Sequence, residues 1–395
     1  MVERKQYLDK LIKSKDLQII KVVTGIRRCG KSTLLKQFRD FLLAGGVDSA
    51  RIIEINYEKV ENEPLKEYHA LYNYVKERLV PEKMTYVFLD EIQEVPDFQR
   101  AIDSLFTCEN IDIYITGSNA KMLSSELSTL LSGRYIEIKM LPLSFKEYFE
   151  LVGGDKFEAW NKYFYNGGLP YAARIEDETI RSDYISGIYN TVLLKDIVQR
   201  NKIQDVSLLE SVVKFLFANI GSIVSSKKIS DSLVSYGRKT TPVTVEHYIE
   251  ALKSSFVFYE VNRYDIKGKQ FLKSLEKYYL VDIGFRTLLL GKKNSDIGHI
   301  LENIVYLELL RRGNTVHIGK IENYEIDFIA DKNGSKAYYQ VSASVLEQSV
   351  FAREITPLKL IKDNYPKYII SMDRLPMGED GIDQVNIVDF LLSDN

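Results

Sequence analysis

The first 140 residues repeat one pattern, in which a short apolar run precedes a longer stretch with apolar positions at helical spacing. Short runs rich in β-branched and aromatic residues are typical of parallel strands buried on both faces. Strands that alternate with helices predict a three-layer α/β domain over residues 1–142. The five expected strands cover residues 19–24, 51–56, 85–90, 111–116 and 135–138.

The loop after the first expected strand fits the phosphate-binding pattern G-x-x-x-x-G-K-[ST]. Its glycines let the backbone fold closely around an anion, and the helix that begins at Lys31 adds the positive end of its dipole. Lys31 is expected to reach the β- and γ-phosphates of ATP, and Ser32 to bind Mg²⁺. A chance glycine-rich turn is the alternative, which the flanking strand and helix disfavour. The predicted nucleotide contacts are Gly25, Ile26, Arg27, Arg28, Cys29, Gly30, Lys31, Ser32 and Thr33.

Two carboxylates, Asp90 and Glu91, end the third expected strand. Ligands of open parallel sheets bind at the carboxyl ends of the strands, which is where these side chains are expected. In a P-loop enzyme Asp90 would hold the Mg²⁺ ion and Glu91 would polarise the attacking water. An exposed acidic turn after a core strand is the alternative.

Small polar residues follow the fourth expected strand, and an arginine precedes the fifth. Thr116, Ser118 and Asn119 compete for contact with the γ-phosphate or the water, and Asn119 is our candidate catalytic residue. Capping of a helix expected at residues 120–131 explains these residues equally well. Arg134 is a candidate to stabilise transition-state charge, from its own site or from a neighbouring subunit. An ordinary surface arginine is the alternative.

The pattern changes after Pro142. Aromatic residues at helical spacing predict a helical lid or linker over residues 143–205. Three short helices and a strand pair then predict a winged-helix domain over residues 206–290. Its last helix carries Glu246 and Glu250 and lacks arginines that would read guanine, so DNA contact and a purely structural role stay open. The lysines and arginines available for DNA phosphates are Lys227, Lys228, Arg238, Lys239, Lys267 and Lys269.

Residues 291–395 show a helix, a hairpin and a strand in an order that resembles the restriction-endonuclease-like fold. That fold needs an aspartate followed by E-x-K, because carboxylates hold the metal and a lysine steadies the hydroxide. Asp327 fits, but Gln340 replaces the glutamate and Ser342 replaces the lysine. The carboxylates of Glu302, Glu308 and Asp327 could still gather one ion. We expect an inactive nuclease-like α/β domain, with metal-dependent cleavage as the weaker hypothesis.

The composition of the chain restricts its expected partners and cellular location. The net charge is 53 − 55 = −2, so no global positive field attracts the chain to nucleic acid or membrane. Two cysteines provide no disulfide framework, and no apolar run reaches the roughly 20 residues of a membrane helix. We therefore expect a cytoplasmic protein without a membrane partner.

The motifs taken together resemble one family. The segments G-I-R-R-C-G-K-S, F-L-D-E-I-Q, L-S-G-R-Y, Y-Y-L-V-D-I-G, L-E-N-I-V-Y-L-E-L-L-R-R-G and E-I-D-F-I-A look like prokaryotic AAA-type ATPases with a carboxyl-terminal domain of unknown function. The resemblance spans nearly the whole chain. It implies ATP binding by the first domain, with Arg134 as an arginine finger, and a nuclease-like last domain without an assigned activity.

Two hypotheses from different classes follow. The first is an Mg²⁺-dependent ATPase that couples hydrolysis to the winged-helix and nuclease-like domains, with DNA as a partner. The second is an ATP-gated binding or regulatory module with little turnover. Either can act as a homo-oligomer or with a partner protein, and the sequence does not decide between these arrangements.

Overall fold

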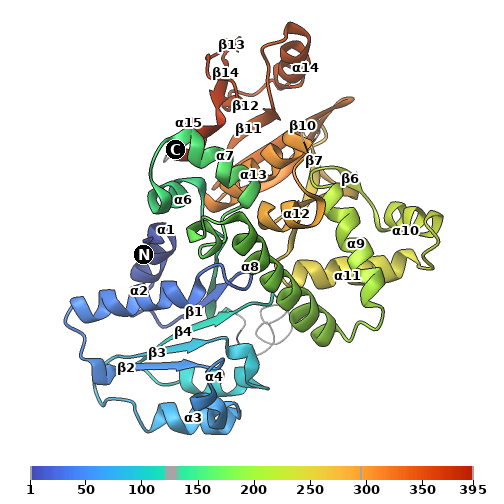
Figure 1. The fold of residues 1–395 in the computed structure, drawn as a ribbon. Helices are drawn as coiled ribbons and strands as arrows, with labels where there is room; N and C mark the ends of the chain where they lie inside the picture. The colour runs from blue at the N-terminus through green and yellow to red at the C-terminus, as the bar shows by residue number, and fades with distance from the viewer. Residues whose placement is uncertain (1, 121–130, 132, 294–295, 394–395) are drawn as a thin grey trace. The chain divides into compact units, whose positions relative to one another are not determined.

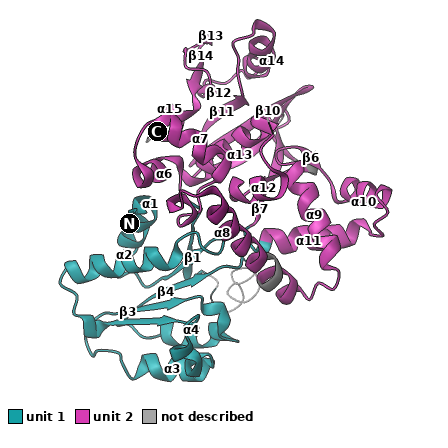
Figure 2. Ribbon diagram, viewed as in Figure 1, with its two compact units in different colours: residues 1–142, 254–256 teal, residues 143–253, 257–395 magenta. Residues whose placement is uncertain are grey.

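The computed structural model describes residues 2–120, 131, 133–293 and 296–393 (Figure 1). Two compact units emerge, coloured separately in Figure 2. Unit 1 comprises residues 1–142 with 254–256, and unit 2 comprises residues 143–253 with 257–395. No helix in the described part of the chain combines the length and the apolar character that crossing a membrane requires. The helix predicted at residues 120–131 lies almost entirely outside the described residues.

Unit 1 contains a five-stranded sheet in the order β2-β3-β4-β1-β5, and all its neighbouring strands are parallel. The predicted parallel α/β sheet is therefore confirmed. Its strands are β1 (Ile20–Thr24), β2 (Ile52–Asn56), β3 (Thr85–Asp90), β4 (Ile111–Gly117) and β5 (Tyr135–Lys139). The described helices are α1 (Lys5–Lys13), α2 (Lys31–Ala44), α3 (Tyr68–Lys76) and α4 (Phe98–Phe106), with the short 3₁₀ helices η1 (Ser49–Arg51), η2 (Val60–Leu65) and η3 (Ile92–Glu94).

Helices cover both faces of this sheet (Figure 1). On one face Phe38 of α2 packs against Phe88 and Tyr114, with ring centroids 6.1 and 4.9 Å apart. On the other face Ile102 of α4 belongs to the same buried cluster as Val87 of β3. Successive strand residues point to opposite faces, so apolar residues at both parities bury both sides of the sheet. This arrangement is the expected three-layer sandwich.

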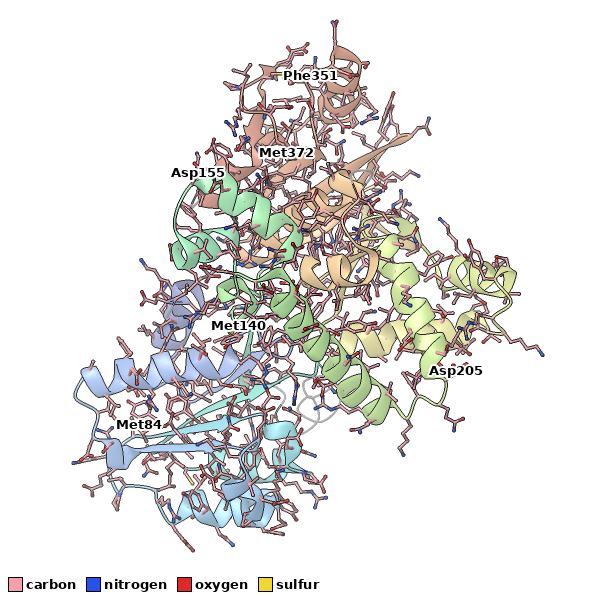
Figure 3. The ribbon with its side chains drawn as sticks, viewed as in Figure 1. Met84, Met140, Asp155, Asp205, Phe351 and Met372 are labelled. Atoms are coloured by element: carbon pink, nitrogen blue, oxygen red, sulfur yellow. The ribbon has the colours of Figure 1, made fainter. Side chains whose placement is uncertain are left out.

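Unit 2 begins with helices. Asp155 and Asp205, both labelled in Figure 3, cap α7 and α9 by accepting hydrogen bonds from backbone N–H groups. The predicted helices at 208–219, 227–236 and 243–254 are present as α9, α10 and α11. The elements of this part are α6 (Phe145–Val152), α7 (Lys156–Asn166), η5 (Ala172–Arg174), α8 (Glu178–Asn190), the π-helix η6 (Thr191–Gln199), α9 (Val206–Ala218), α10 (Ser226–Ser235) and α11 (Pro242–Ser254).

A nine-stranded mixed sheet forms the rest of unit 2, in the order β13-β14-β12-β11-β10-β9-β7-β8-β6. The strands are β6 (Ile223–Val224), β7 (Phe258–Asp265), β8 (Gln270–Leu280), β9 (Thr315–Ile321), β10 (Tyr324–Lys332), β11 (Ser335–Ser342), β12 (Lys367–Ser371), β13 (Gly378–Glu379) and β14 (Ile382–Asn386). The helices are α12 (Ile283–Leu290), α13 (Ile297–Arg311), α14 (Gln348–Lys359) and α15 (Ile387–Leu392).

The hairpin expected as a wing is part of this larger sheet. Strand β7 pairs in parallel with β9, so the sheet continues across residue 290, where a domain boundary is predicted. Strand β8 begins at Gln270, seven residues before the predicted start at Lys277. Its amino-terminal part is held by pairing with β7, an interaction that local pattern does not reveal. The winged-helix assignment and the boundaries at 205 and 290 remain predictions.

Side chains of α13 fix β8 in place. Asn303, which is fully buried, accepts from the Leu280 N–H at 2.7 Å and donates to the Leu280 carbonyl at 2.8 Å. It thereby satisfies both polar groups of a buried backbone residue. Glu302, the preceding residue, accepts from the ammonium of Lys277 at 2.9 Å. The L-E-N motif is thus explained by packing and hydrogen bonding inside unit 2.

A second set of buried hydrogen bonds connects the turn after α7 with the start of α12. The carboxylate of Asp282 accepts from the N–H groups of Gly168 at 2.7 Å and Gly284 at 2.8 Å. Burial raises the pKa of Asp282 to about 7, although these N–H groups favour the charged form. A Cβ at Gly167 would lie 1.9 Å from Asp282 Oδ1, so the carboxylate leaves no room for a side chain there.

Candidate active site

The loop between β1 and α2 has the backbone shape of an anion cradle. Gly25 and Gly30 have φ angles of +149° and +108°, and Arg28 has +68°. A Cβ at Gly25 would lie 2.2 Å from the carbonyl oxygen of Met140, the residue after β5 (labelled in Figure 3). Among the described residues, nothing accepts a hydrogen bond from the Arg28 and Gly30 N–H groups. These N–H groups are therefore available to an anionic ligand.

Lys31 is the first residue of α2, and its side chain turns back over the loop. Its ammonium donates to the carbonyl oxygens of Gly25 at 3.1 Å and Ile26 at 3.3 Å. It also lies 3.3 Å from Glu91 Oε1, with both side chains less than a tenth exposed. Burial alone would lower the pKa of Lys31, but the neighbouring Glu91 carboxylate holds it above its ordinary value.

Asp90 ends β3 inside a network of hydroxyl and amide groups. Thr116 of β4 donates to Asp90 Oδ1 at 2.6 Å, and Asn56 of β2 donates to Oδ2 at 2.7 Å. The Ser32 side chain lies near enough to this carboxylate to favour its charged form. Burial raises the pKa of Asp90 despite these donors. The structure thus brings Ser32 and Asp90, the two predicted metal ligands, close to each other.

Glu91 follows Asp90 in a left-handed conformation, with φ +55°. This conformation is uncommon outside glycine, and here the Glu91 N–H donates to Thr116 Oγ1 at 2.9 Å. Gln93 donates to the second carboxylate oxygen. Burial alone would raise the pKa of Glu91, but Lys31, Gln93 and Arg27 together keep it below its ordinary value. Glu91 is therefore charged at neutral pH, as a base requires.

The three polar residues at the end of β4 have different surroundings. Thr116 is fully buried and connects Asp90 with Glu91. Ser118 is 1 % exposed, and its hydroxyl has no hydrogen-bond partner among the described residues. Asn119 is half-buried and already has an interaction partner. The unpartnered hydroxyl of Ser118 makes it a better candidate than Asn119 for contact with a ligand.

The arginines lie at opposite edges of the sheet. Arg27 in the loop forms an ion pair with Glu58 at 3.0 Å. Arg134 precedes β5, where Tyr135 pairs with Ile20 at the start of β1. It therefore lies at the amino edge, roughly 20 Å along the strand from Gly25 at about 3.3 Å per residue. Its side chain is partly exposed and pairs with Asp103. The structure does not bring Arg134 to the loop of its own chain.

Besides Gln93, which holds Glu91, two residues of this site were missed in the sequence. Asn56 holds Asp90 from the neighbouring strand β2, and its position at the carboxyl end of an expected strand was a usable signal. Arg4 donates to the carbonyl oxygen of Cys29 at 3.0 Å and is 3 % exposed. Arg4 and Cys29 are 25 residues apart in the chain, and the sequence around Arg4 contains no pattern that predicts their contact. Cys29 itself is fully buried, and burial raises the pKa of its thiol, which disfavours a reactive thiolate.

The carboxylates of residues 291–395 that could have gathered one ion have other partners in the structure. Glu308 pairs with Arg311 at 2.6 Å and Arg312 at 3.0 Å. The ammonium of Lys277 instead bridges Glu302 at 2.9 Å and Glu325 at 2.7 Å. Within the described ranges, no three His, Cys, Asp or Glu side chains form a group that could hold a metal ion.

Asp327 and Gln340 contact each other near the ammonium of Lys277. Gln340 Oε1 accepts from the Asp327 N–H at 2.7 Å, and its amide donates to Glu354 at 3.2 Å. The hydroxyl of Ser342 donates to the carbonyl oxygen of Ser344 at 3.1 Å. Lys277 thus provides a positive charge in this region that Ser342 cannot provide.

Comparison with known proteins places these observations in a family. Residues 18–149 match the AAA domain, and residues 157–296 match a domain of unknown function, DUF8612. An uncharacterized protein of Haemophilus influenzae is 40% identical over 399 residues, covering 99% of both chains. An uncharacterized protein of Methanocaldococcus jannaschii is 28% identical, covering 94% of this chain and 85% of its own.

A solved structure shares the fold. The Walker-type ATPase of Pyrococcus abyssi superimposes with a TM-score of 0.52 and 16% sequence identity. The match covers 73% of this chain and 96% of that chain. At this level of identity the likeness concerns the fold alone.

Replacing Gly25 tests the shape of the loop. Gly25→Ala places a Cβ against the Met140 carbonyl and forces alanine to φ +149°, so we expect a loss of stability of at least about 1–3 kcal/mol. Thermal unfolding is the measurement. Gly45→Ala is the matched control, because Gly45 has φ −78° and a Cβ there would meet atoms no closer than 3.4 Å. Equal unfolding temperatures for the two variants would contradict the described loop.

Proposed function

The chain belongs to the same family as the Haemophilus influenzae protein and has an AAA-type P-loop domain in its amino-terminal part. From this premise we propose that the protein hydrolyses ATP with Mg²⁺. ATP binding itself follows from the AAA domain and the fold it shares with a Walker-type ATPase. One observation carries the further step to hydrolysis. Lys31 and Ser32 at the start of α2 and Asp90 and Glu91 at the end of β3 come from two separate segments and lie together beside one anion cradle.

The donor set fits Mg²⁺ with a nucleotide. Mg²⁺ is usually bound by one or two protein oxygens together with phosphate oxygens and water, and Ser32 with Asp90 offers such a pair. When bound, Mg²⁺ neutralises charge on the phosphates and orients them. The Met140 carbonyl occupies the space that a Cβ at Gly25 would need, so the loop can pass there only as glycine. The N–H groups of Arg28 and Gly30, which have no acceptor among the described residues, are available to phosphate oxygens.

The side chains of the site have separate roles in the proposed reaction. Lys31 exchanges its carbonyl and Glu91 partners for β- and γ-phosphate oxygens, which leaves Glu91 free to accept a proton from water. Gln93 and the backbone bond to Thr116 hold Glu91 in orientation. Thr116 and Asn56 hold Asp90, and Ser118 offers its unpartnered hydroxyl to the γ-phosphate or the water.

Glu91→Gln separates binding from hydrolysis. Glutamine keeps the size of the side chain but accepts no proton from water, so we expect turnover to fall by about 10²–10⁴-fold. ATP should still bind to Glu91→Gln, whereas Lys31→Ala should lose affinity for the phosphates. Phosphate release and equilibrium nucleotide binding are the measurements, with Glu54→Gln on the exposed face of β2 as the control.

The result also decides between the two classes of function. Wild-type phosphate release no faster than that of Lys31→Ala, together with intact ATP binding, would reject the enzyme and favour the ATP-gated regulatory module. Equal turnover by wild type and Glu91→Gln would reject Glu91 as the base.

We propose that Arg134 acts on the site of a neighbouring subunit. Its position at the amino edge of β5 separates it from its own phosphate loop, while its partly exposed guanidinium can meet another chain. An arginine supplied in this way stabilises charge on the transferred phosphate.

Mixing two inactive variants tests this arrangement. Arg134→Ala and Glu91→Gln should each be slow alone, and their mixture should regain turnover because one subunit supplies Glu91 and its neighbour supplies Arg134. The phosphate release rate of each protein and of the mixture is measured over a range of concentrations. Arg39→Ala removes a partly exposed arginine of α2 and should keep wild-type turnover. A mixture no faster than its components would contradict action between subunits.

DNA binding is a second candidate function, supported by the exposed turn between α10 and α11. Residues 234–239 are all exposed, and Tyr236 is 82 % exposed. Four exposed basic side chains lie there and at the start of α10: Lys227, Lys228, Arg238 and Lys239. Glu246 and Glu250 are exposed on α11, so the turn would contact phosphates and read no sequence.

Removing two charges from this turn tests the contact. Arg238→Ala with Lys239→Ala should weaken binding to duplex DNA and lower the slope of log affinity against log salt by about 2, since each phosphate contact contributes about 0.9. Fluorescence anisotropy with a labelled duplex is the measurement. Lys5→Ala with Lys83→Ala removes the same charge from exposed positions of unit 1 and should leave the slope unchanged. Equal slopes for both double variants would reject the turn as the contact.

A further inference from the structure

An arginine outside the phosphate-loop motif connects the loop to the end of unit 1. Arg4 lies just before α1 and is 3 % exposed. One guanidinium nitrogen donates to the Cys29 carbonyl at 3.0 Å, and the other donates to the Leu141 carbonyl at 2.7 Å and the Pro142 carbonyl at 3.5 Å. One side chain thus holds both the middle of the loop and residues 141–142, which end the first segment of this unit.

The contact at Cys29 bears on the orientation of the loop. The peptide between Cys29 and Gly30 is planar and trans, so its carbonyl and its N–H point in opposite directions. By holding the carbonyl, Arg4 directs the Gly30 N–H away from itself. That N–H has no acceptor among the described residues, and it belongs to the predicted anion cradle.

Neighbouring groups hold the guanidinium in place. Its carbon lies 5.0 Å from the ring centroid of Tyr7, a cation–π contact. The Tyr7 hydroxyl accepts from the Leu141 N–H at 3.2 Å. The Arg4 N–H donates to Gln37 of α2 at 3.3 Å. Arg4 is therefore fixed from α1, α2 and the segment after β5, all within unit 1.

We propose that Arg4 is a positioning residue of the nucleotide site. It acts through the Cys29 carbonyl to hold the Gly30 N–H in the orientation that binds phosphate. The same side chain also binds the carbonyl groups of Leu141 and Pro142, so it couples the conformation of the loop to that of the segment after β5. The proposal rests on nucleotide binding at this loop, which belongs to the proposed function.

Arg4→Met removes the donors and keeps much of the apolar stem. Because charge-assisted hydrogen bonds contribute about 1.5–3 kcal/mol, we expect MgATP affinity to fall by roughly 10–100-fold. The turnover rate at saturating ATP should change little, because Lys31, Asp90 and Glu91 are untouched. Arg4→Lys keeps one charged donor and should recover part of the affinity. Equilibrium binding and the separate values of KM and kcat are the measurements.

Arg51→Met is the matched control. Arg51 donates to the Met84 carbonyl at 2.8 Å and lies over the Tyr86 ring at 5.9 Å, at the amino edge of the same sheet. It makes the same kinds of contact as Arg4 but none with the loop. Its loss should lower thermal stability without changing MgATP affinity.

Hydrogen exchange without nucleotide provides a separate readout. Arg4→Met should accelerate amide exchange of residues 26–31 and 140–143, whereas Arg51→Met should leave both segments as in wild type. Wild-type protein that binds no MgATP would overturn the proposed function, and the exchange result would still decide on Arg4. Unchanged loop exchange, or an affinity loss no larger than that of Arg51→Met, would overturn the proposed role of Arg4.

Discussion

A lysine and a glutamate buried side by side at the carboxyl edge of a parallel sheet define this site. Neither Lys31 nor Glu91 is stable as an isolated charge in such surroundings, since desolvation of a single ion costs several kcal/mol. Each raises the other's preference for the charged form, and the loop carbonyls complete the shell of the ammonium. In the proposed function, a bound phosphate replaces Glu91 as the partner of Lys31. The pair therefore keeps both groups charged until substrate arrives.

Local pattern in the sequence predicted the elements of this site well. Buried parallel strands appear as continuous apolar runs, and the phosphate loop needs glycines at fixed spacing, so both features are encoded within a few residues. The position of Arg134 was not predictable in this way, because it depends on the order of strands in the sheet. Arg4 was missed because its contacts lie 25 and 137 residues away in the chain. The choice between Ser118 and Asn119 required burial, which neighbouring sequence did not provide.

In unit 2 the sequence predicted helices better than it predicted the sheet. The helices α9, α10 and α11 end within two residues of their expected limits, because apolar spacing and capping residues are local signals. The pairing of β7 with β9 brings together residues more than fifty positions apart, and no local pattern encodes it. The role of Lys277 was missed for a similar reason, because its ammonium pairs with Glu302, 25 residues away, and with Glu325, 48 residues away. Glu302, one of the carboxylates that could have held a metal ion, is thus paired with a lysine instead.

The most direct test of the account is a crystal structure with Mg²⁺ and a non-hydrolysable ATP analogue. The account predicts that Lys31 Nζ leaves Glu91 and lies about 2.7–2.9 Å from phosphate oxygens. It also predicts Mg²⁺ within about 2.0–2.1 Å of a Ser32 oxygen, with Asp90 beside it. A nucleotide bound elsewhere, with the Lys31–Glu91 pair intact, would contradict the central claim.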